Sequence, residues 1–221
     1  DERSIPPLIA FPEQKFEHSI EVFAHEFQHS VKSDFVILET NYKNPESSAL
    51  NEALSDFFGA IADTSKYRWQ TDINGTVYRD LENPTSNISG YSGPDHLDKF
   101  IFPVAGKSPE DNYGNGHINS TIVSHALYLL SEGGKKKDIN TYGIGIDNAA
   151  QIIFYSLPTL NNNAKFYEAR NAFLLTCNNL SNFGRFSANY CNQVKNAFAA
   201  VGIGSPASES HLQKDLWGVG F

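Results

Sequence analysis

The sequence is poor in sulfur and has no long apolar run. Its 221 residues include no methionine and only two cysteines, Cys177 and Cys191. No apolar stretch reaches the roughly 20 residues of a membrane-spanning helix, and no signal peptide is recognisable. Because the first residue is Asp1, we expect a processed form or a piece of a longer chain. Because it lacks a long apolar run, the sequence predicts no membrane-spanning helix.

The chain also lacks an excess of positive charge. Its formal net charge is -8 and its isoelectric point is about 5.3. A surface of this sign repels phosphate backbones and anionic membranes, so we expect no nucleic-acid partner and no membrane partner. Apolar residues make up 40% of the chain and aromatic residues 13%, which is enough for a sizeable core. Disorder is therefore excluded.

Helical periodicity dominates what is present. It runs through six segments, residues 18–31, 47–63, 118–130, 147–157, 164–180 and 187–201. Residues 64–116 are dense in Gly, Pro, Asn, Asp and Ser and are predicted to be mostly irregular, and Lys135 to Lys137 a solvated turn. We expect an extended lead-in at 1–17 with a short strand near Leu8, one main domain at 18–204, and a polar tail at 205–221.

The first helical segment carries the pattern His25-Glu26-Phe27-Gln28-His29. Apolar residues recur around it at the spacing of a helix with one buried face: Ile20, Phe23, Ala24, Phe27 and Val31. Two histidines four residues apart project from one helix face with stems about 6 Å apart, which suits two ligands of one zinc ion. Glu26 would reach a water on that metal, as in zinc peptidases. A solvated helix face is the alternative.

The second helical segment offers the missing ligand. Glu52 is a carboxylate on a helix expected to pack against the first, and a third ligand is what the two histidines lack. Asp56 lies one turn further on the same face, where it could accept the spare ring N–H of a ligating histidine. An exposed acidic stripe is the alternative, but the apolar flanking residues favour a buried face.

Further motifs follow in order: Asn51-Glu52-Ala53-Leu54-Ser55-Asp56, Pro94-Asp95-His96, Gly116-His117-Ile118-Asn119-Ser120 and Gly143-Ile144-Gly145. With the histidine pattern they make the chain resemble the catalytic C-terminal portion of the thermolysin-like neutral zinc metalloproteases, from about residue 19 to residue 202. The resemblance implies a mainly α fold, the helical lobe of a thermolysin-like zincin, with the zinc-binding helix near the N-terminus and long irregular loops.

The resemblance implies a zinc ion held by His25, His29 and Glu52, with Glu26 as general base and proton shuttle. It implies that Asp56 and Asn51 support the two histidines from behind. It also implies a calcium site near Glu21 and Asp63. Arg68 stands where the family has an acidic residue, so a full double-calcium site is not expected, and a single weak site is the alternative that stays open.

The same resemblance assigns the substrate side of the site. His117 matches the histidine that helps to hold the oxyanion, and Asp111 matches the residue that orients it. Tyr42 matches a tyrosine that also donates to the oxyanion. Arg79 matches the arginine that supports the substrate's carbonyl group and the primed-side pocket, and Val22 is expected to line that pocket.

These assignments predict a secreted zinc endopeptidase that cleaves protein or peptide substrates beside bulky hydrophobic residues on the primed side. The family's β-rich N-terminal lobe is not in this sequence, so a separate lobe or a propeptide is an expected partner. The alternative is a catalytically inactive zinc-binding fragment or recognition domain. In a secreted protein Cys177 and Cys191 would form a disulfide; two free buried thiols are the alternative.

Overall fold

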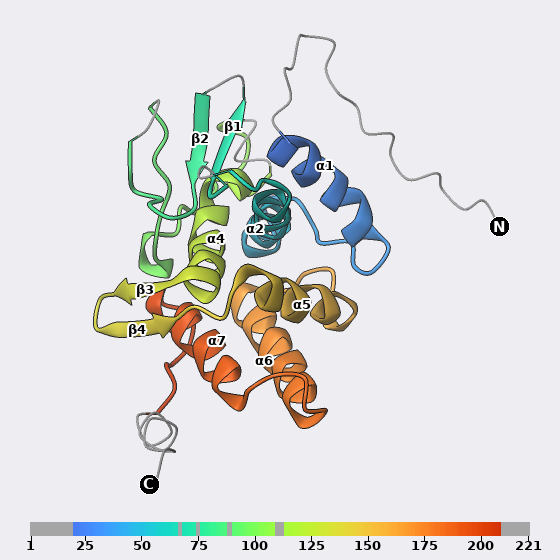
Figure 1. Ribbon diagram of the computed structural model, residues 1–221. Helices are drawn as coiled ribbons and strands as arrows, with labels where there is room; N and C mark the ends of the chain where they lie inside the picture. Colours follow the sequence, from blue (N-terminus) through green and yellow to red (C-terminus); the bar gives the residue numbers. More distant parts are fainter. Residues whose placement is uncertain (1–19, 66–67, 74–75, 88–89, 109–112, 209–221) are drawn as a thin grey trace, which may run out of the picture.

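The computed structural model describes residues 20–65, 68–73, 76–87, 90–108 and 113–208 (Figure 1). Its α-helices are α1 (Ile20–Ser33), α2 (Pro45–Ala62), α4 (Gly116–Glu132), α5 (Ile146–Ser156), α6 (Phe166–Asn182) and α7 (Ala188–Ala200). The 3-10 helices η1 (Leu97–Lys99) and η2 (Leu157–Thr159) are single turns. The prediction of a mainly α fold is confirmed. Within the described ranges no helix is long and apolar enough to cross a membrane.

Local sequence signals explain most helix ends. α2 begins with Pro45, which has no backbone N–H. Proline is well suited to this position because an N–H in the first turn would have no partner within the helix. The Glu168 carboxylate accepts from the backbone N–H of Lys165 before α6, at 2.7 Å. Ser187 caps α7 by accepting from the Asn189 N–H, and α4 stops at Gly133, whose φ of 85° suits glycine. The helices therefore begin and end within a few residues of the predicted segments.

Two short antiparallel hairpins correct the sequence prediction. β1 (Gln70–Ile73) pairs with β2 (Thr76–Asp80), so the segment 64–116 is not wholly irregular. β3 (Gly133–Lys136) pairs with β4 (Ile139–Tyr142), so the predicted turn at residues 135–137 was wrong for its first two residues. Strands of four or five residues are too short for an alternating pattern to stand out, which is why both hairpins were missed.

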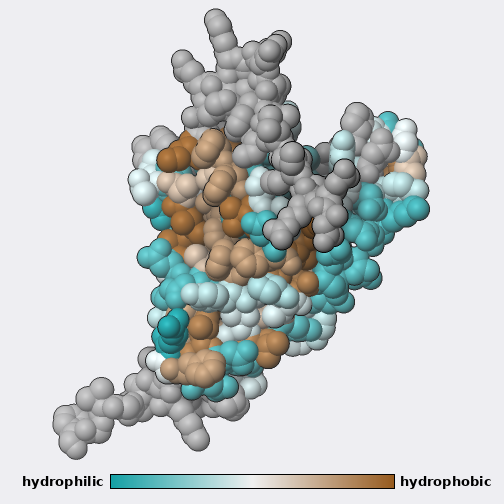
Figure 2. Space-filling model, turned by 90° about the vertical axis from the view of Figure 1, so that its right-hand side faces the viewer, coloured by the Kyte–Doolittle hydropathy of each residue, from teal (hydrophilic) through white to brown (hydrophobic). Residues whose placement is uncertain are grey.

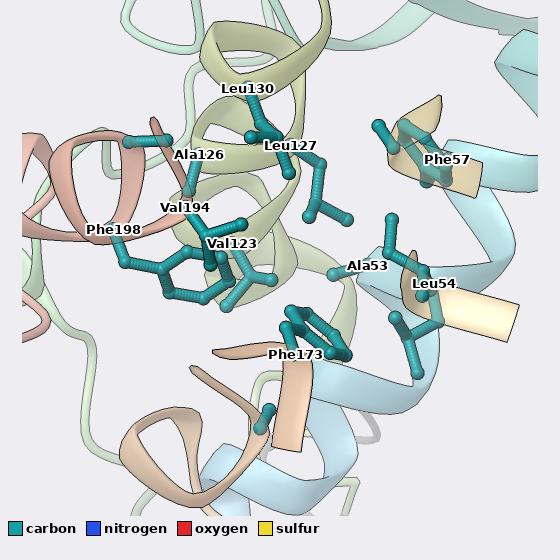
Figure 3. Close-up of a cluster of buried hydrophobic side chains, with 14 of the residues drawn as sticks. Ala53, Leu54, Phe57, Val123, Ala126, Leu127, Leu130, Phe173, Val194 and Phe198 are labelled. Carbon is teal, nitrogen blue, oxygen red and sulfur yellow. The ribbon is translucent and has the colours of Figure 1, made fainter. Parts of the chain in front are cut away.

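α2 is the central helix of the molecule and packs chiefly against α4 and α1 (Figure 1). Leu54 and Phe57 of α2 are fully buried, as predicted from their spacing. Figure 3 shows the cluster that surrounds them, with residues from α4, α6 and α7: Val123, Ala126, Leu127, Leu130, Phe173, Val194 and Phe198. The hydrophobic core thus packs against one side of α2, and α1 packs against another side.

α1 lies on α2 with its polar face inward. Glu21, His25, Gln28 and Lys32 are its buried residues. Its large apolar side chains are exposed: Ile20 by 58%, Phe23 by 49% and Phe27 by 52%. The prediction that these apolar residues form the buried face was therefore wrong. Two of these polar side chains have partners on α2: His25 lies beside Glu52 and Asp56, and Lys32 donates to Asn51 and Ser55. These contacts favour the inward orientation of the polar face.

A glycine sets how closely the two helices approach. A Cβ atom added at Gly59 of α2 would lie 2.8 Å from the backbone oxygen of Glu21 on α1. Contacts this short are not tolerated between a methyl group and a rigid helix backbone. The close approach brings the polar face of α1 within side-chain reach of α2.

The predicted disulfide is present and joins Cys177 of α6 to Cys191 of α7. Both cysteines are buried at the interface of these helices. A cross-link that closes a loop of this length stabilises a fold by about 3 kcal/mol, chiefly by restricting the unfolded chain. The two C-terminal helices therefore form a covalently fixed hairpin behind the core.

Candidate metal centre and active site

Three side chains from α1 and α2 converge on one point. The Nε2 atoms of His25 and His29 lie 3.1 Å apart, and the Glu52 carboxylate lies 3.3 Å from the first and 3.7 Å from the second. Zinc bonds of about 2.0 to 2.1 Å in tetrahedral geometry put neighbouring ligand atoms about 3.3 Å apart. Within the described residues this is the group of three side chains with metal-binding geometry.

The chemistry of these atoms also calls for a cation. Two imidazole lone pairs and a carboxylate oxygen point at one another, and such an arrangement is repulsive unless a proton or metal ion lies between them. The Glu52 Oε2 atom is buried and has no hydrogen-bond partner in the described part of the chain. A set of two nitrogens and one oxygen matches the known preferences of zinc. The residues present therefore fit the metal that the resemblance implies.

His25 is backed by a buried ion pair. Its Nδ1 lies 2.9 Å from Asp56 Oδ1, which is the supporting contact that the sequence predicted. Arg79 from β2 grips the same carboxylate from the other side, donating from Nε at 2.8 Å and from Nη2 at 2.6 Å. Asp56 is fully buried. This chain of contacts fixes the orientation of the His25 ring.

His29 has different surroundings. Its Nδ1 lies 3.3 Å from Asn51 Nδ2, 3.2 Å from Ser55 Oγ and 3.4 Å from Lys32 Nζ. The sequence predicted the Asn51 contact but assigned no role to Ser55 or Lys32. The position of Lys32, seven residues after His25 on the same helix face, was the available signal.

Burial and neighbouring charges separate the proton affinities of the two histidines. Burial alone would lower the pKa of His25, but the Asp56 and Glu52 carboxylates outweigh it and raise that pKa to about 9. For His29 burial prevails, aided by the cations nearby, and lowers the pKa to about 3. Burial likewise lowers the pKa of Lys32 to about 7. The first histidine thus has a strong carboxylate support that the second lacks.

The acids of the site are held ionised despite their burial. The His25, His29 and His117 rings hold the pKa of Glu52 well below its usual value. The Arg79 guanidinium, together with His25, lowers the pKa of Asp56 to about 2. Because Asp56 is paired with Arg79, Glu52 is the acid whose buried negative charge faces the two histidine Nε2 atoms.

Glu26 and His117 lie at the mouth of the site. Glu26 is exposed on α1, next to His25 and directed toward a cavity of about 410 Å³ that it helps to line. His117 comes from the first turn of α4, and its Nε2 lies 3.3 Å from Glu52 Oε2. Gly116 permits this approach, because a Cβ there would lie 2.5 Å from Ser48 Oγ on α2. A base and a hydrogen-bond donor thus border the candidate metal centre.

The cavity has a mostly apolar wall. Val22 and Arg79 line it, and the substrate roles assigned to them stay predictions. The sequence did not single out the other lining residues, among them Tyr78 and Tyr91, whose rings lie 4.7 Å apart, and also Thr71, Gly93, Ile118 and Thr121. These residues come from β1, β2, the following loop and α4. No local pattern could reveal a wall assembled from four separate segments.

Other predicted site residues are not brought to the centre by any contact described here. Tyr42 lies in the turn before α2 with 42% of its surface exposed, and its role stays a prediction. Asp111 falls outside the described residues. Asp63 accepts from the N–H and hydroxyl of Ser65, and it forms with Glu21 no group of three metal-binding side chains among the described residues, so the calcium site also stays a prediction.

Fold and site together define a helical domain that presents a His, His, Glu metal centre beside an apolar cavity. The family described as thermolysin metallopeptidase, alpha-helical domain, matches residues 39–203. The chain belongs to this family. The matched segment contains Glu52, Asp56, Arg79 and His117, while the helix with His25 and His29 precedes it.

Comparison with individual proteins supports the same family. The chain is 34% identical over 190 residues to bacillolysin of Brevibacillus brevis, covering 83% of this chain and 33% of that protein. It is 34% identical over 203 residues to thermolysin of Alicyclobacillus acidocaldarius, covering 85% and 34%. Neutral protease B of Bacillus subtilis is 31% identical over 196 residues, covering 84% and 32%. The chain thus spans about a third of the length of these relatives.

Proposed function

We propose that this chain is the metal-binding half of a zinc-dependent endopeptidase. The observation that carries the proposal is the spacing of His25 Nε2, His29 Nε2 and the Glu52 carboxylate, which matches the edges of a zinc tetrahedron with one corner left for water. The protease names of its relatives support the reaction class.

The chain's own residues supply the proton transfers of peptide hydrolysis. Zinc, when bound, would polarise the peptide carbonyl and lower the pKa of water to about 7. Glu26 then accepts the proton of the attacking water and delivers it to the departing amine. His117 donates from its ring to the developing oxyanion, an interaction that typically contributes about 10² to 10³ in turnover. The roles proposed for Tyr42 and Asp111 are a second donor and the group that orients His117.

The cavity beside Glu26 supports a preference for bulky hydrophobic side chains on the primed side. Its wall is mostly apolar, with Val22, Tyr78, Tyr91 and Ile118 among the lining residues, and its volume of about 410 Å³ accommodates a large side chain. Arg79 also lines the cavity, where its guanidinium could donate to a substrate carbonyl.

A second lobe is proposed as the partner that completes the cleft. Ile20, Phe23 and Phe27 on α1 are about half exposed, and the face with α1 and α5 is broadly apolar (Figure 2). Phe35, just after α1, and Phe154 of α5 are also exposed, and their ring centroids lie 5.4 Å apart. Exposed patches of this kind mark interaction sites. The relatives are about three times as long as the matched region, so they contain further chain that could cover it.

The exposed α1 face also favours a second functional candidate. If catalysis needs both walls of the cleft, this chain binds zinc but does not cleave peptides until the β-rich lobe or a propeptide is in place. Extracellular location is proposed on the strength of the disulfide, since such bonds persist in oxidising surroundings. A single calcium ion near Glu21 and Asp63 is the remaining proposed cofactor.

Cleavage of a fluorogenic peptide with a leucine on the primed side tests the function. We expect chelator-sensitive cleavage by the chain, alone or mixed with the N-terminal lobe of a relative. Glu26→Gln should lower kcat/KM by about 10² to 10⁴ and leave bound zinc at one per chain, because the base is not a ligand. The control is Phe183→Gln, because Phe183 is exposed at the C-terminal end of α6.

Three outcomes separate the candidates. Cleavage by the chain alone supports a self-sufficient endopeptidase, and cleavage only with the added lobe supports the half-site. Zinc binding without cleavage, both by the chain alone and with the added lobe, would contradict the proposed activity. It would favour the alternative, a zinc-binding recognition domain.

A further inference from the structure

Lys32 is an unusual residue to find beneath a metal centre. It is 2% exposed and is among the largest fully buried side chains of the described chain. Lysine is almost never buried completely unless its amino group has partners. Lys32 follows His29 by three residues on α1, so both side chains point from the same face toward α2. A buried lysine beside a candidate metal ligand therefore needs a functional explanation.

The amino group of Lys32 reaches two oxygens of α2. Nζ donates to the backbone oxygen of Asn51 at 2.8 Å and to Ser55 Oγ at 3.2 Å. The Ser55 hydroxyl donates in turn to the same backbone oxygen at 3.2 Å. With its own proton thus directed away, Ser55 Oγ keeps a lone pair available to a further donor.

His29 can be that further donor when it binds a metal through Nε2. A histidine that binds a metal through Nε2 carries its proton on Nδ1, and this N–H needs an acceptor. Asn51 Nδ2 and Lys32 Nζ, both near His29 Nδ1, are themselves donors, whereas Ser55 Oγ at 3.2 Å can accept. The proton on Nδ1 leaves the Nε2 lone pair pointing at Glu52.

We propose that Lys32 is a positioning residue that acts through Ser55 to hold His29 in the metal-binding tautomer. The inference rests on the proposed metal centre and deepens it. Lys32 does not touch the metal or the substrate; it orients the Ser55 hydroxyl, which orients the ring. His29 therefore obtains from a lysine and a serine the support that His25 obtains from Asp56 and Arg79.

Zinc affinity and the cobalt spectrum test this role. Lys32→Met keeps the length of the side chain and removes its donors, and we expect zinc affinity, measured by competition with a chromophoric chelator, to fall about 10- to 100-fold. The visible bands of the cobalt-loaded chain should change. Ser55→Ala should have a similar effect, and the double variant should bind no more weakly than Ser55→Ala alone. Lys107→Met, an exposed lysine in a loop, is the control.

The metal-free chain offers an independent test. Long-range ¹H–¹⁵N spectra should show His29 protonated at Nδ1 in the wild type and a mixture of tautomers in Lys32→Met. An unchanged tautomer, additive losses in the double variant, or zinc affinity equal to or above that of the wild type would overturn the role of Lys32. Failure of the wild type to bind zinc would instead overturn the metal centre, and the tautomer would still decide the role of Lys32.

Discussion

Asp56 is the most enclosed acid of the metal centre, and Arg79 is its counter-ion. The carboxylate is fully buried, and the guanidinium meets it with two hydrogen bonds. A buried pair adds little stability compared with apolar residues, but the loss of one partner leaves a charge without compensation. The contact also links β2 to the helix that carries Glu52.

Arg79→Met should therefore lower the free energy of unfolding by about 3 kcal/mol, because the variant leaves the Asp56 charge buried with one partner fewer. Urea unfolding followed by circular dichroism measures the change. Arg185→Met, at an exposed arginine, serves as the control and should stay within about 0.5 kcal/mol of the wild type. Equal stability of Arg79→Met and the control would contradict the account.

Residues four apart on one helix were predictable as neighbours, because helix geometry alone places His25 beside His29. Glu52 and Asp56 could be placed on one buried face for the same reason. The contact of Arg79 with Asp56 could not be found from spacing, since it depends on how the β1–β2 hairpin folds over α2. Tyr78 and Tyr91 escaped prediction for the same physical reason.

The packing of α1 on α2 determines whether the ligands meet. Gly59→Ala would place a methyl group 2.8 Å from the Glu21 oxygen, so α1 must move away from α2. The higher helix propensity of alanine would by itself stabilise the chain by about 1 kcal/mol. We expect instead a lower melting temperature and weaker zinc binding, measured by calorimetry and chelator competition. A stabilised variant with unchanged zinc affinity would show that the helices are not in tight contact.

The loop before η1 is tied to the β3–β4 hairpin by Asp95. Partial burial opposes its ionisation, but the ammonium groups of Lys136 and Lys99 at 2.6 and 2.8 Å outweigh this and hold the pKa of Asp95 below its usual range. A pKa that is lower in the folded than in the unfolded state stabilises the fold above the unfolded value of about 3.9. This contribution is lost as the pH falls through the folded pKa.

Asp95→Asn should consequently lower the free energy of unfolding at pH 7 by about 1 kcal/mol, a modest figure because solvent screens the pair. The difference from the wild type should shrink steadily as the pH falls below 4 and should vanish only once the pH is below the folded pKa of Asp95. Urea titrations at pH 7, 4 and 2 provide the measurement. A difference that is independent of pH would mean that the ion pairs do not stabilise the fold.

At the scale of elements, periodicity located the six α-helices of the described residues but misjudged which face of α1 is buried. It correctly identified which residues share a face, Phe23 with Phe27 and His25 with His29. It could not decide which face is buried, because that depends on the partners available in the rest of the chain. Here the ligand face packs on α2, whereas Ile20, Phe23 and Phe27 on the other face stay about half exposed among the described residues.

The molecule as a whole presents an apolar face and matches about a third of its relatives' length. If that face receives a second lobe, Phe27→Gln should weaken association with the N-terminal lobe of bacillolysin at least tenfold, since a large side chain contributes about 1.5 to 3 kcal/mol when buried. The stability of the chain itself should change by less than about 0.5 kcal/mol, because Phe27 is half exposed.

Calorimetric titration of the two polypeptides gives this affinity. Phe183→Gln removes an exposed phenylalanine ring at the end of α6 and should leave the association unchanged. Equal affinities of both variants would show that α1 is not the docking surface.

X-ray absorption of the zinc-loaded chain tests the central claim most directly. The account predicts one zinc per chain, with two imidazole nitrogens, one carboxylate oxygen and one water in the first coordination sphere, and loss of that spectrum in His29→Ala and Glu52→Ala. A coordination sphere without imidazole, or one that survives both substitutions, would contradict it.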